Sequence, residues 1–261
     1  MDSAAPRSKR LWLSIELTVL FFAVPAAMTF WRLNPQAVAE AAATLGIEAD
    51  FLAKPGRFML PSLMAFTIVC LVYLLRDRSF ERKRLWNARA AWRCLPKCTA
   101  EFVPLAGLLT LLAWQLTPGS YLLTAAANLG VPPRWLPGMA SLFRLPSEKP
   151  LLWVMIMVLY PLVSVWPQEV LYRAFFFHRY AALLRTPEAR IAASAIAFGF
   201  MHILFMNLIA PLLCLIGGVL FAATYERTHS TLAASIQHAL YGCWIFTVGL
   251  GPYFFGGTVY P

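Results

Sequence analysis

The sequence predicts an all-α protein, a polytopic bundle of about seven to eight transmembrane helices. The first observation is composition: 60% of the 261 residues are hydrophobic and 13% are charged, whereas soluble domains carry about 25% charged residues. So little charge cannot cover a water-facing surface. The second observation is a series of apolar stretches close to the length of about 20 residues that crosses a bilayer. Soluble globular enzymes, disordered chains and collagen-like repeats are therefore excluded.

Seven stretches are predicted to span the bilayer: residues 11–31, 58–75, 102–116, a long helix that begins near 151 and continues past 173, 189–205, 211–225 and 231–250. The first is longer than the roughly 7–15 apolar residues of a cleavable signal peptide, so we interpret it as a retained span. A candidate eighth span, 121–129, precedes a segment with three prolines, which favours a re-entrant or loop structure.

The chain carries 22 Lys and Arg against 12 Asp and Glu, a net charge of +10. In a membrane protein this excess is typical of cytoplasmic loops and does not indicate nucleic-acid binding. Most basic residues fall on the cytoplasmic side if the N-terminus is inside, chiefly in the predicted basic loop 76–97. We expect one integral membrane unit, with N-terminal transmembrane helices in 1–150, a helical core in 151–250 and a C-terminal tail in 251–261.

Ionisable residues inside the predicted spans are the main indication of function, because charge near the bilayer centre is costly and usually functional. The ionisable ones are Glu16, Glu169, Arg173, His202 and His238, and the uncharged companions are Gln168 and Asn207. All the ionisable residues except Glu16 lie in the last four spans. No partner for Glu16 is evident from the sequence, and its carboxylate is expected to reach the headgroups near the end of its span.

Glu169 and Arg173 are four residues apart, so they lie on one helical face and can form an ion pair. With His202 and His238 they suit two chemistries. In the first, Glu169 takes a proton from water as a general base while the histidines stabilise the oxyanion or protonate the leaving amine. In the second, Glu169, His202 and His238 bind a zinc ion that activates the water. No compact zinc motif is present, and the residues alone do not decide between the two.

Three segments in this region carry a resemblance: QEVLYR at 168–173, FGFMH at 198–202 and HALYG at 238–242. In order and spacing they resemble the EExxxR, FxxxH and HxxxN-type motifs of the CPBP family. These are Abi-type intramembrane proteases related to type II CAAX prenyl endopeptidases. The similarity covers about 151–242. It implies a helical bundle around an intramembrane cavity, with 151–250 as the catalytic core.

The resemblance also implies roles for individual residues. Glu169 would be the base, His202 and His238 polarising or proton-transfer groups, and Arg173 the partner that keeps Glu169 ionised. Gln168 would orient water or a substrate carbonyl. Phe198, Gly242 and Asn207 complete the expected site as supporting residues. A metal-free glutamate mechanism is favoured over zinc, which remains the alternative cofactor.

Two positions depart from the family pattern. Gln168 replaces the first Glu of EExxxR, to which the family assigns most of the water activation, and a glutamine cannot act as a base. We interpret this as a branch with Gln-Glu in place of Glu-Glu. Gly242 stands where an asparagine would help to form the oxyanion hole. Asn207, five residues after His202, is a candidate substitute for that donor if it faces inward.

The sequence therefore predicts an intramembrane endopeptidase of a bacterial inner membrane. Its expected partners are a membrane-associated peptide or protein substrate and the lipid bilayer, with no nucleic acid. One alternative is a non-catalytic membrane scaffold or immunity-type protein that keeps the fold, which the two departures favour. A small transporter is a further alternative, disfavoured because the sequence shows no internal repeat.

Overall fold

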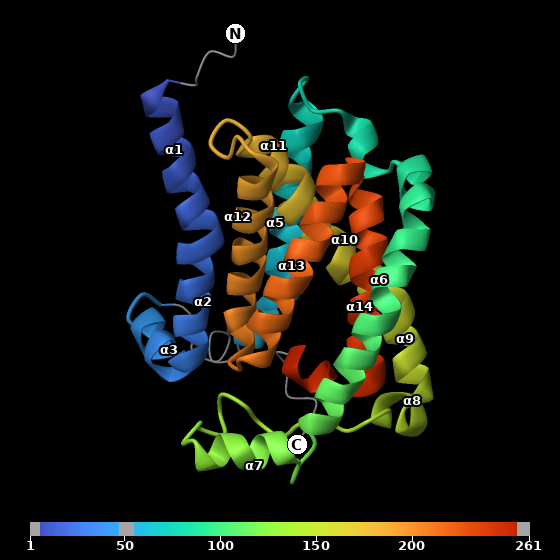
Figure 1. Ribbon diagram of the computed structural model, residues 1–261. Helices are drawn as coiled ribbons and strands as arrows, with labels where there is room; N and C mark the ends of the chain where they lie inside the picture. The colour runs from blue at the N-terminus through green and yellow to red at the C-terminus, as the bar shows by residue number, and fades with distance from the viewer. Residues whose placement is uncertain (1–5, 47–54, 255–261) are drawn as a thin grey trace.

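The computed structural model describes residues 6–46 and 55–254, and this part of the chain is helical without any strand (Figure 1). Six helical segments are long and apolar enough to cross a membrane: Arg7–Leu33, Gly56–Arg76, Arg82–Gln115, Pro150–Arg179, Pro187–Phe205 and Ile209–Thr228. Each of these six segments of the described chain overlaps one of the first six predicted spans. The all-α transmembrane class is confirmed, and the protein is an integral membrane protein.

The first span consists of α1 (Arg7–Thr18) and α2 (Val24–Leu33), joined by one π-helical turn, Val19–Ala23. Pro25 has no amide hydrogen, so the α-helical hydrogen-bond ladder cannot continue regularly into it. A short helix, α3 (Pro35–Ala43), follows. The second span is α5 (Met59–Arg76), which is preceded by a 3₁₀ turn.

The third span begins earlier than the sequence indicated. The expected span was 102–116, but α6 is a single helix of 28 residues, Ala88–Gln115. The Asn87 side chain caps its N-terminus by accepting a hydrogen bond from Ala90 N at 3.1 Å. The second half of the predicted basic loop 76–97 is therefore helical, and the first half contains a 3₁₀ turn, Arg82–Leu85.

The candidate eighth span is not a transmembrane helix. Residues Tyr121–Asn128 form the short helix α7, which lies across one end of the bundle (Figure 1). Helix α8 (Arg144–Glu148) follows a loop at the same end. The expectation of a re-entrant or loop segment was correct in that this region does not cross the bundle.

The fourth span is one long helix, as predicted, made of α9 (Pro150–Tyr160), α10 (Trp166–Glu169) and α11 (Phe176–Arg179). Two π-helical segments, Pro161–Val165 and Val170–Phe175, separate them. Two of its prolines, at positions 161 and 167, lack the amide hydrogen that a regular ladder needs. The wider π turns often mark functional sites, and here they flank Glu169.

The last three helices are α12 (Pro187–Met201), α13 (Ile209–Thr228) and α14 (Thr231–Val248). Helix α14 corresponds to the seventh predicted span and contacts α6, α9, α10 and α13. It is not among the six apolar segments because Gln237 and His238 make it more polar. Both side chains are buried, so the polar side of α14 also packs against neighbouring helices.

Ion pairs at one end of the bundle tie distant segments together. Glu16, which was expected to reach the headgroups, instead accepts two hydrogen bonds from Arg179, at 2.8 and 2.5 Å, and one from Tyr180 at 3.1 Å. Arg190 of α12 pairs with Glu226 of α13 at 2.5 Å. The prediction for Glu16 was wrong because its partner is 163 positions away in the sequence.

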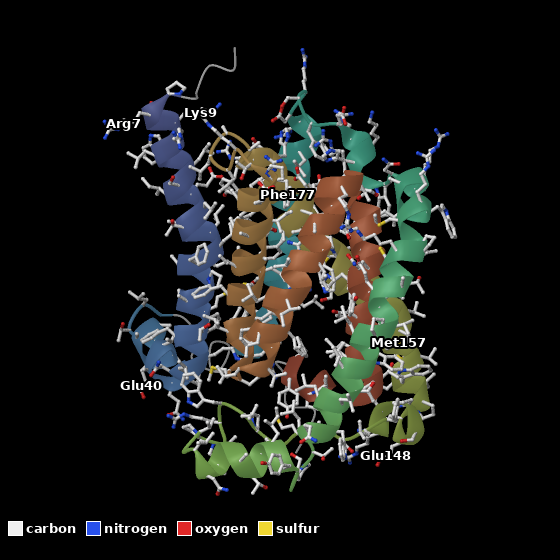
Figure 2. The ribbon with its side chains drawn as sticks, in the orientation of Figure 1. Arg7, Lys9, Glu40, Glu148, Met157 and Phe177 are labelled. Atoms are coloured by element: carbon white, nitrogen blue, oxygen red, sulfur yellow. The ribbon has the colours of Figure 1, made fainter. Side chains whose placement is uncertain are left out.

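The two ends of the bundle differ in charge. Figure 2 shows Arg7 and Lys9 at one end, and Glu40 and Glu148 at the opposite end. The predicted tail 251–261 begins at the latter end. Its first residues, Gly251–Phe254, form a 3₁₀ turn in which Tyr253 is fully buried, so they are part of the core rather than a free tail. Residues 255–261 lie outside the described part of the chain.

Candidate active site

Glu169 and Arg173 form the ion pair that their spacing predicted. Arg173 Nε lies 3.1 Å from Glu169 Oε2, and both side chains are completely buried. Arg173 Nη1 also donates to Ser194 Oγ at 2.5 Å, and the guanidinium lies over the Phe198 ring, 5.2 Å from its centroid. Charges this deep are costly unless they are paired, and here the two side chains are each other's ion-pair partner.

The second oxygen of Glu169 contacts a histidine from another helix. Glu169 Oε1 lies 2.9 Å from Nδ1 of His238, which is on α14. Because an ionised carboxylate only accepts hydrogen bonds, Nδ1 carries the hydrogen and Nε2 keeps its lone pair. The imidazole is stacked on Phe221 at 4.5 Å between ring centroids. Its orientation and its tautomer are thus both set by neighbours.

His202 is the residue that directly follows α12. Its Nδ1 donates to the Phe198 backbone oxygen at 2.7 Å, so its Nε2 is also the unprotonated nitrogen. The Phe198 ring lies between the groups of the site. Its centroid is 4.7 Å from the His202 ring and 5.5 Å from the His238 ring. Phe198 therefore acts as a spacer that positions both imidazoles.

Both histidines line an apolar cavity of about 220 Å³. Its walls come from α6, α9, α12, α13 and α14, and Phe254, the last residue of the described chain, completes them. Two lining residues are largely exposed: Leu108 of α6 at 59% and Ile216 of α13 at 58%. The cavity therefore reaches the lipid-facing surface between α6 and α13, which stand side by side in Figure 1.

Glu169 itself is not among the residues that line this cavity. It lies behind His238, with one oxygen toward that imidazole and the other toward Arg173. The groups that can contact a water molecule in the cavity are therefore the Nε2 atoms of His238 and His202. This arrangement differs from the expectation that the carboxylate would touch the water directly.

Two expected supporting residues point elsewhere. The Gln168 amide donates to Ser164 Oγ at 2.8 Å, one turn earlier on its own helix. Asn207 donates to Tyr253 O at 2.9 Å and to Phe205 O at 3.1 Å, and its Oδ1 accepts from Ala210 N at 2.9 Å. Neither residue lines the cavity. Asn207 instead fixes the start of α13 and the Gly251–Phe254 turn, so it does not replace an oxyanion donor.

Tyr160 is a site residue that the sequence reasoning missed. Its hydroxyl is 3.4 Å from His238 Nε2, and its ring lines the cavity. It reaches this place because Gly242 has no side chain: a Cβ at 242 would overlap the Tyr160 ring and hydroxyl. A glycine inside a helix commonly marks such a close approach, and this was the signal available in the sequence.

The residues do not fit the zinc site that was the alternative to a metal-free mechanism. Within residues 6–46 and 55–254, no group of three His, Cys, Asp or Glu side chains is arranged to hold a metal ion. Of the proposed ligands Glu169, His202 and His238, the first already directs one oxygen to Arg173 and the other to His238 Nδ1. A zinc ion in the cavity would find the two imidazoles without the carboxylate, and no step is derived through it.

Comparison with known proteins identifies the segment that contains the site. Residues 150–244 match the family model described as type II CAAX prenyl endopeptidase Rce1-like. This range coincides with the resemblance seen over 151–242 and includes Glu169, Arg173, His202 and His238. No curated protein and no solved structure shows significant similarity to the chain. Residues 150–244 are therefore similar to the Rce1-like type II CAAX prenyl endopeptidase family.

Proposed function

We propose that the protein is an intramembrane endopeptidase that hydrolyses a peptide bond of a membrane-associated substrate. The observation that carries this proposal is the hydrogen bond between the buried Glu169 and His238, whose other nitrogen is at the cavity wall. A carboxylate that orients an imidazole at the wall of a cavity is a general-base arrangement. The cavity opens to lipid between α6 and α13, as access by a membrane-embedded peptide requires.

In this mechanism His238 Nε2 takes a proton from a water molecule in the cavity. The hydroxide adds to the carbonyl carbon, and Glu169 stabilises the imidazolium through Nδ1. When the tetrahedral intermediate collapses, the C–N bond breaks and His238 returns the proton to the leaving amine. His202, with its free Nε2 in the same cavity, is the second group able to bind water or the amine. Arg173 keeps Glu169 ionised throughout.

We further propose that the N-terminus is cytoplasmic. The end of the bundle that carries Arg7 and Lys9 (Figure 2) also contains the basic segment 76–97. Basic residues near span ends favour the cytoplasmic side. Single-cysteine accessibility at Ser8 and at Glu148, on opposite ends, tests this orientation. Labelling of the Ser8 variant from the outside would contradict it.

The proposed activity is tested by comparing protein termini in membranes that contain the wild type, Glu169→Ala, His202→Ala or His238→Ala at equal abundance. His178→Ala is the matched control, because this histidine pairs with Asp77 outside the cavity. We expect specific cleaved termini in the wild type and the control and their loss in the three site variants. Unchanged termini in all folded variants would instead support a non-catalytic scaffold of the same fold.

A further inference from the structure

Besides the two histidines, the Tyr160 hydroxyl is a polar group at the cavity, and the mechanism above gives it no role. Tyr160 is the last residue of α9, and its ring lies edge-on to His238 and to Phe246. Its hydroxyl is 3.4 Å from His238 Nε2. That distance is longer than an ordinary hydrogen bond to a hydroxyl. The Tyr160 hydroxyl is therefore held only weakly and can turn toward a third group in the cavity.

Glu169, His238 and Tyr160 form a line of hydrogen-bonding groups. The carboxylate accepts from Nδ1, and Nε2 faces the phenol hydroxyl. A water molecule within reach of Nε2 is consequently also close to the Tyr160 hydroxyl. The carbonyl that this water attacks must lie at the same place, in an otherwise apolar pocket where a single donor has a large effect.

Three other candidate donors near the site, on His202, Asn207 and Gln168, are already occupied. His202 donates its only ring hydrogen to Phe198 O. The amide hydrogens of Asn207 bond to the backbone oxygens of Phe205 and Tyr253. Gln168 donates to Ser164. Tyr241 also lines the cavity with a buried hydroxyl, but that hydroxyl has no hydrogen bond to any described residue, and so no contact aligns it with His238.

Gly242 and Tyr160 fit each other. The shortest approaches of a Cβ built at 242 would be to Tyr160 Cε1, Oη and Cζ, all inside van der Waals contact. Gly242 is buried in the interior of α14, where a glycine weakens the helix by about 1 kcal/mol relative to alanine. The missing side chain is explained by the tyrosine from α9 that fills its space.

We propose that Tyr160 donates the hydrogen bond that stabilises the substrate carbonyl oxygen as it becomes an oxyanion, an inference that rests on the proposed function. The Tyr160 hydroxyl keeps its proton throughout. The water proton goes to His238 Nε2, the hydroxide forms the new C–O bond, and His238 later protonates the leaving nitrogen as the C–N bond breaks. Tyr160 is thus a catalytic residue placed by α9, and Gly242 provides its space.

The first test removes only the hydroxyl. Tyr160→Phe should lower the rate at which the cleaved termini appear by about 100-fold or more, as loss of one oxyanion donor does elsewhere. Tyr172→Phe is the matched control, because it removes another buried tyrosine hydroxyl that does not line the cavity. An unchanged rate in Tyr160→Phe, or an equal loss in the control, would overturn the inference. A loss confined to Tyr241→Phe would assign the role to that residue instead.

The second test changes the side chains at 242 and 160, and it measures thermal unfolding in detergent as well as cleavage. Gly242→Asn should destabilise the protein, because its side chain collides with Tyr160. Tyr160→Ala with Gly242→Asn should recover most of the stability and part of the cleavage, since space is restored and an amide donor returns. Absence of this rescue would contradict the proposed fit.

The two proposals fail in different ways. If wild type and Glu169→Ala give the same termini, the proposed function is wrong and the catalytic role of Tyr160 falls with it. If the wild type cleaves and Tyr160→Phe cleaves equally well, the protease assignment stands and only the role of Tyr160 is overturned.

Discussion

Glu169 Oε1 accepts a hydrogen bond from Nδ1 of His238 at 2.9 Å, across 69 positions of sequence and between α10 and α14. The same carboxylate pairs with Arg173 through its other oxygen. One buried group thus orients a histidine at the cavity and neutralises an arginine in the core. Its proposed catalytic effect and its structural effect can be separated by substitution.

Glu169→Gln should destabilise the protein by about 3–5 kcal/mol, because Arg173 is left as an unpaired buried charge. Combining it with Arg173→Met removes both charges and should restore most of the free energy of unfolding. Cleavage should stay at least about 100-fold below wild type in both variants, since His238 loses its carboxylate. Denaturant unfolding and terminus quantification check this. Restored cleavage in the double variant would contradict the role of Glu169.

A pH effect is expected at the end of the bundle where Asp77 accepts a hydrogen bond from His178 at 2.8 Å. The hydrogen bonds from His178 and then from Ser79 hold the pKa of the Asp77 carboxyl well below its usual range. A carboxyl whose pKa is lowered on folding stabilises the protein above its unfolded pKa of about 3.9, and this contribution is lost as the pH falls further. The difference in melting temperature between wild type and Asp77→Asn should be largest near neutral pH and shrink below about pH 4. A difference that is constant with pH would contradict this origin.

Glu16 and Arg179 connect the first span to the end of the fourth, and their charges should be exchangeable. Glu16→Arg places two cations together and should lower the melting temperature, because it removes two hydrogen bonds and adds repulsion. Glu16→Arg combined with Arg179→Glu should recover part of the loss. Since the pair is about 30% exposed, its net contribution is modest. Equal stability in the single and double variants would show that the contact is not formed.

The sequence predicted the elements that depend on local pattern and missed those that depend on distant contacts. Apolar length located the spans, and the four-residue spacing of Glu169 and Arg173 predicted their ion pair. The early start of α6 was missed because Arg89, Arg93 and Lys97 lower its hydropathy, although Asn87 is a typical capping residue. The pairing of Glu169 with His238, and the approach of Tyr160 to Gly242, depend on how α9, α10 and α14 pack.

Close packing of α12 against α13 should depend on glycines. A Cβ at Gly218 would lie 3.0 Å from Ala195 Cα, which is backbone and cannot move aside easily. Gly218→Leu should therefore force the helices apart and destabilise the protein by about 1–3 kcal/mol or more. Gly107 of α6 has nothing within 4 Å of its Cβ position, so Gly107→Leu is the matched control and should have little effect. Equal melting temperatures for the two variants would contradict the close approach.

Access to the cavity from the lipid should be sensitive to bulk at its rim. Ile216 lines the cavity and is 58% exposed, whereas Leu212, one turn earlier on α13, is 55% exposed but does not line it. Ile216→Trp should narrow the opening between α6 and α13 and slow the appearance of cleaved termini about 10-fold, with no change in melting temperature because the side chain faces lipid. Leu212→Trp adds the same bulk on the same helix and should cleave like the wild type. If both variants, or neither, lose cleavage, the substrate does not enter between α6 and α13, and the route must lie at an end of the bundle instead.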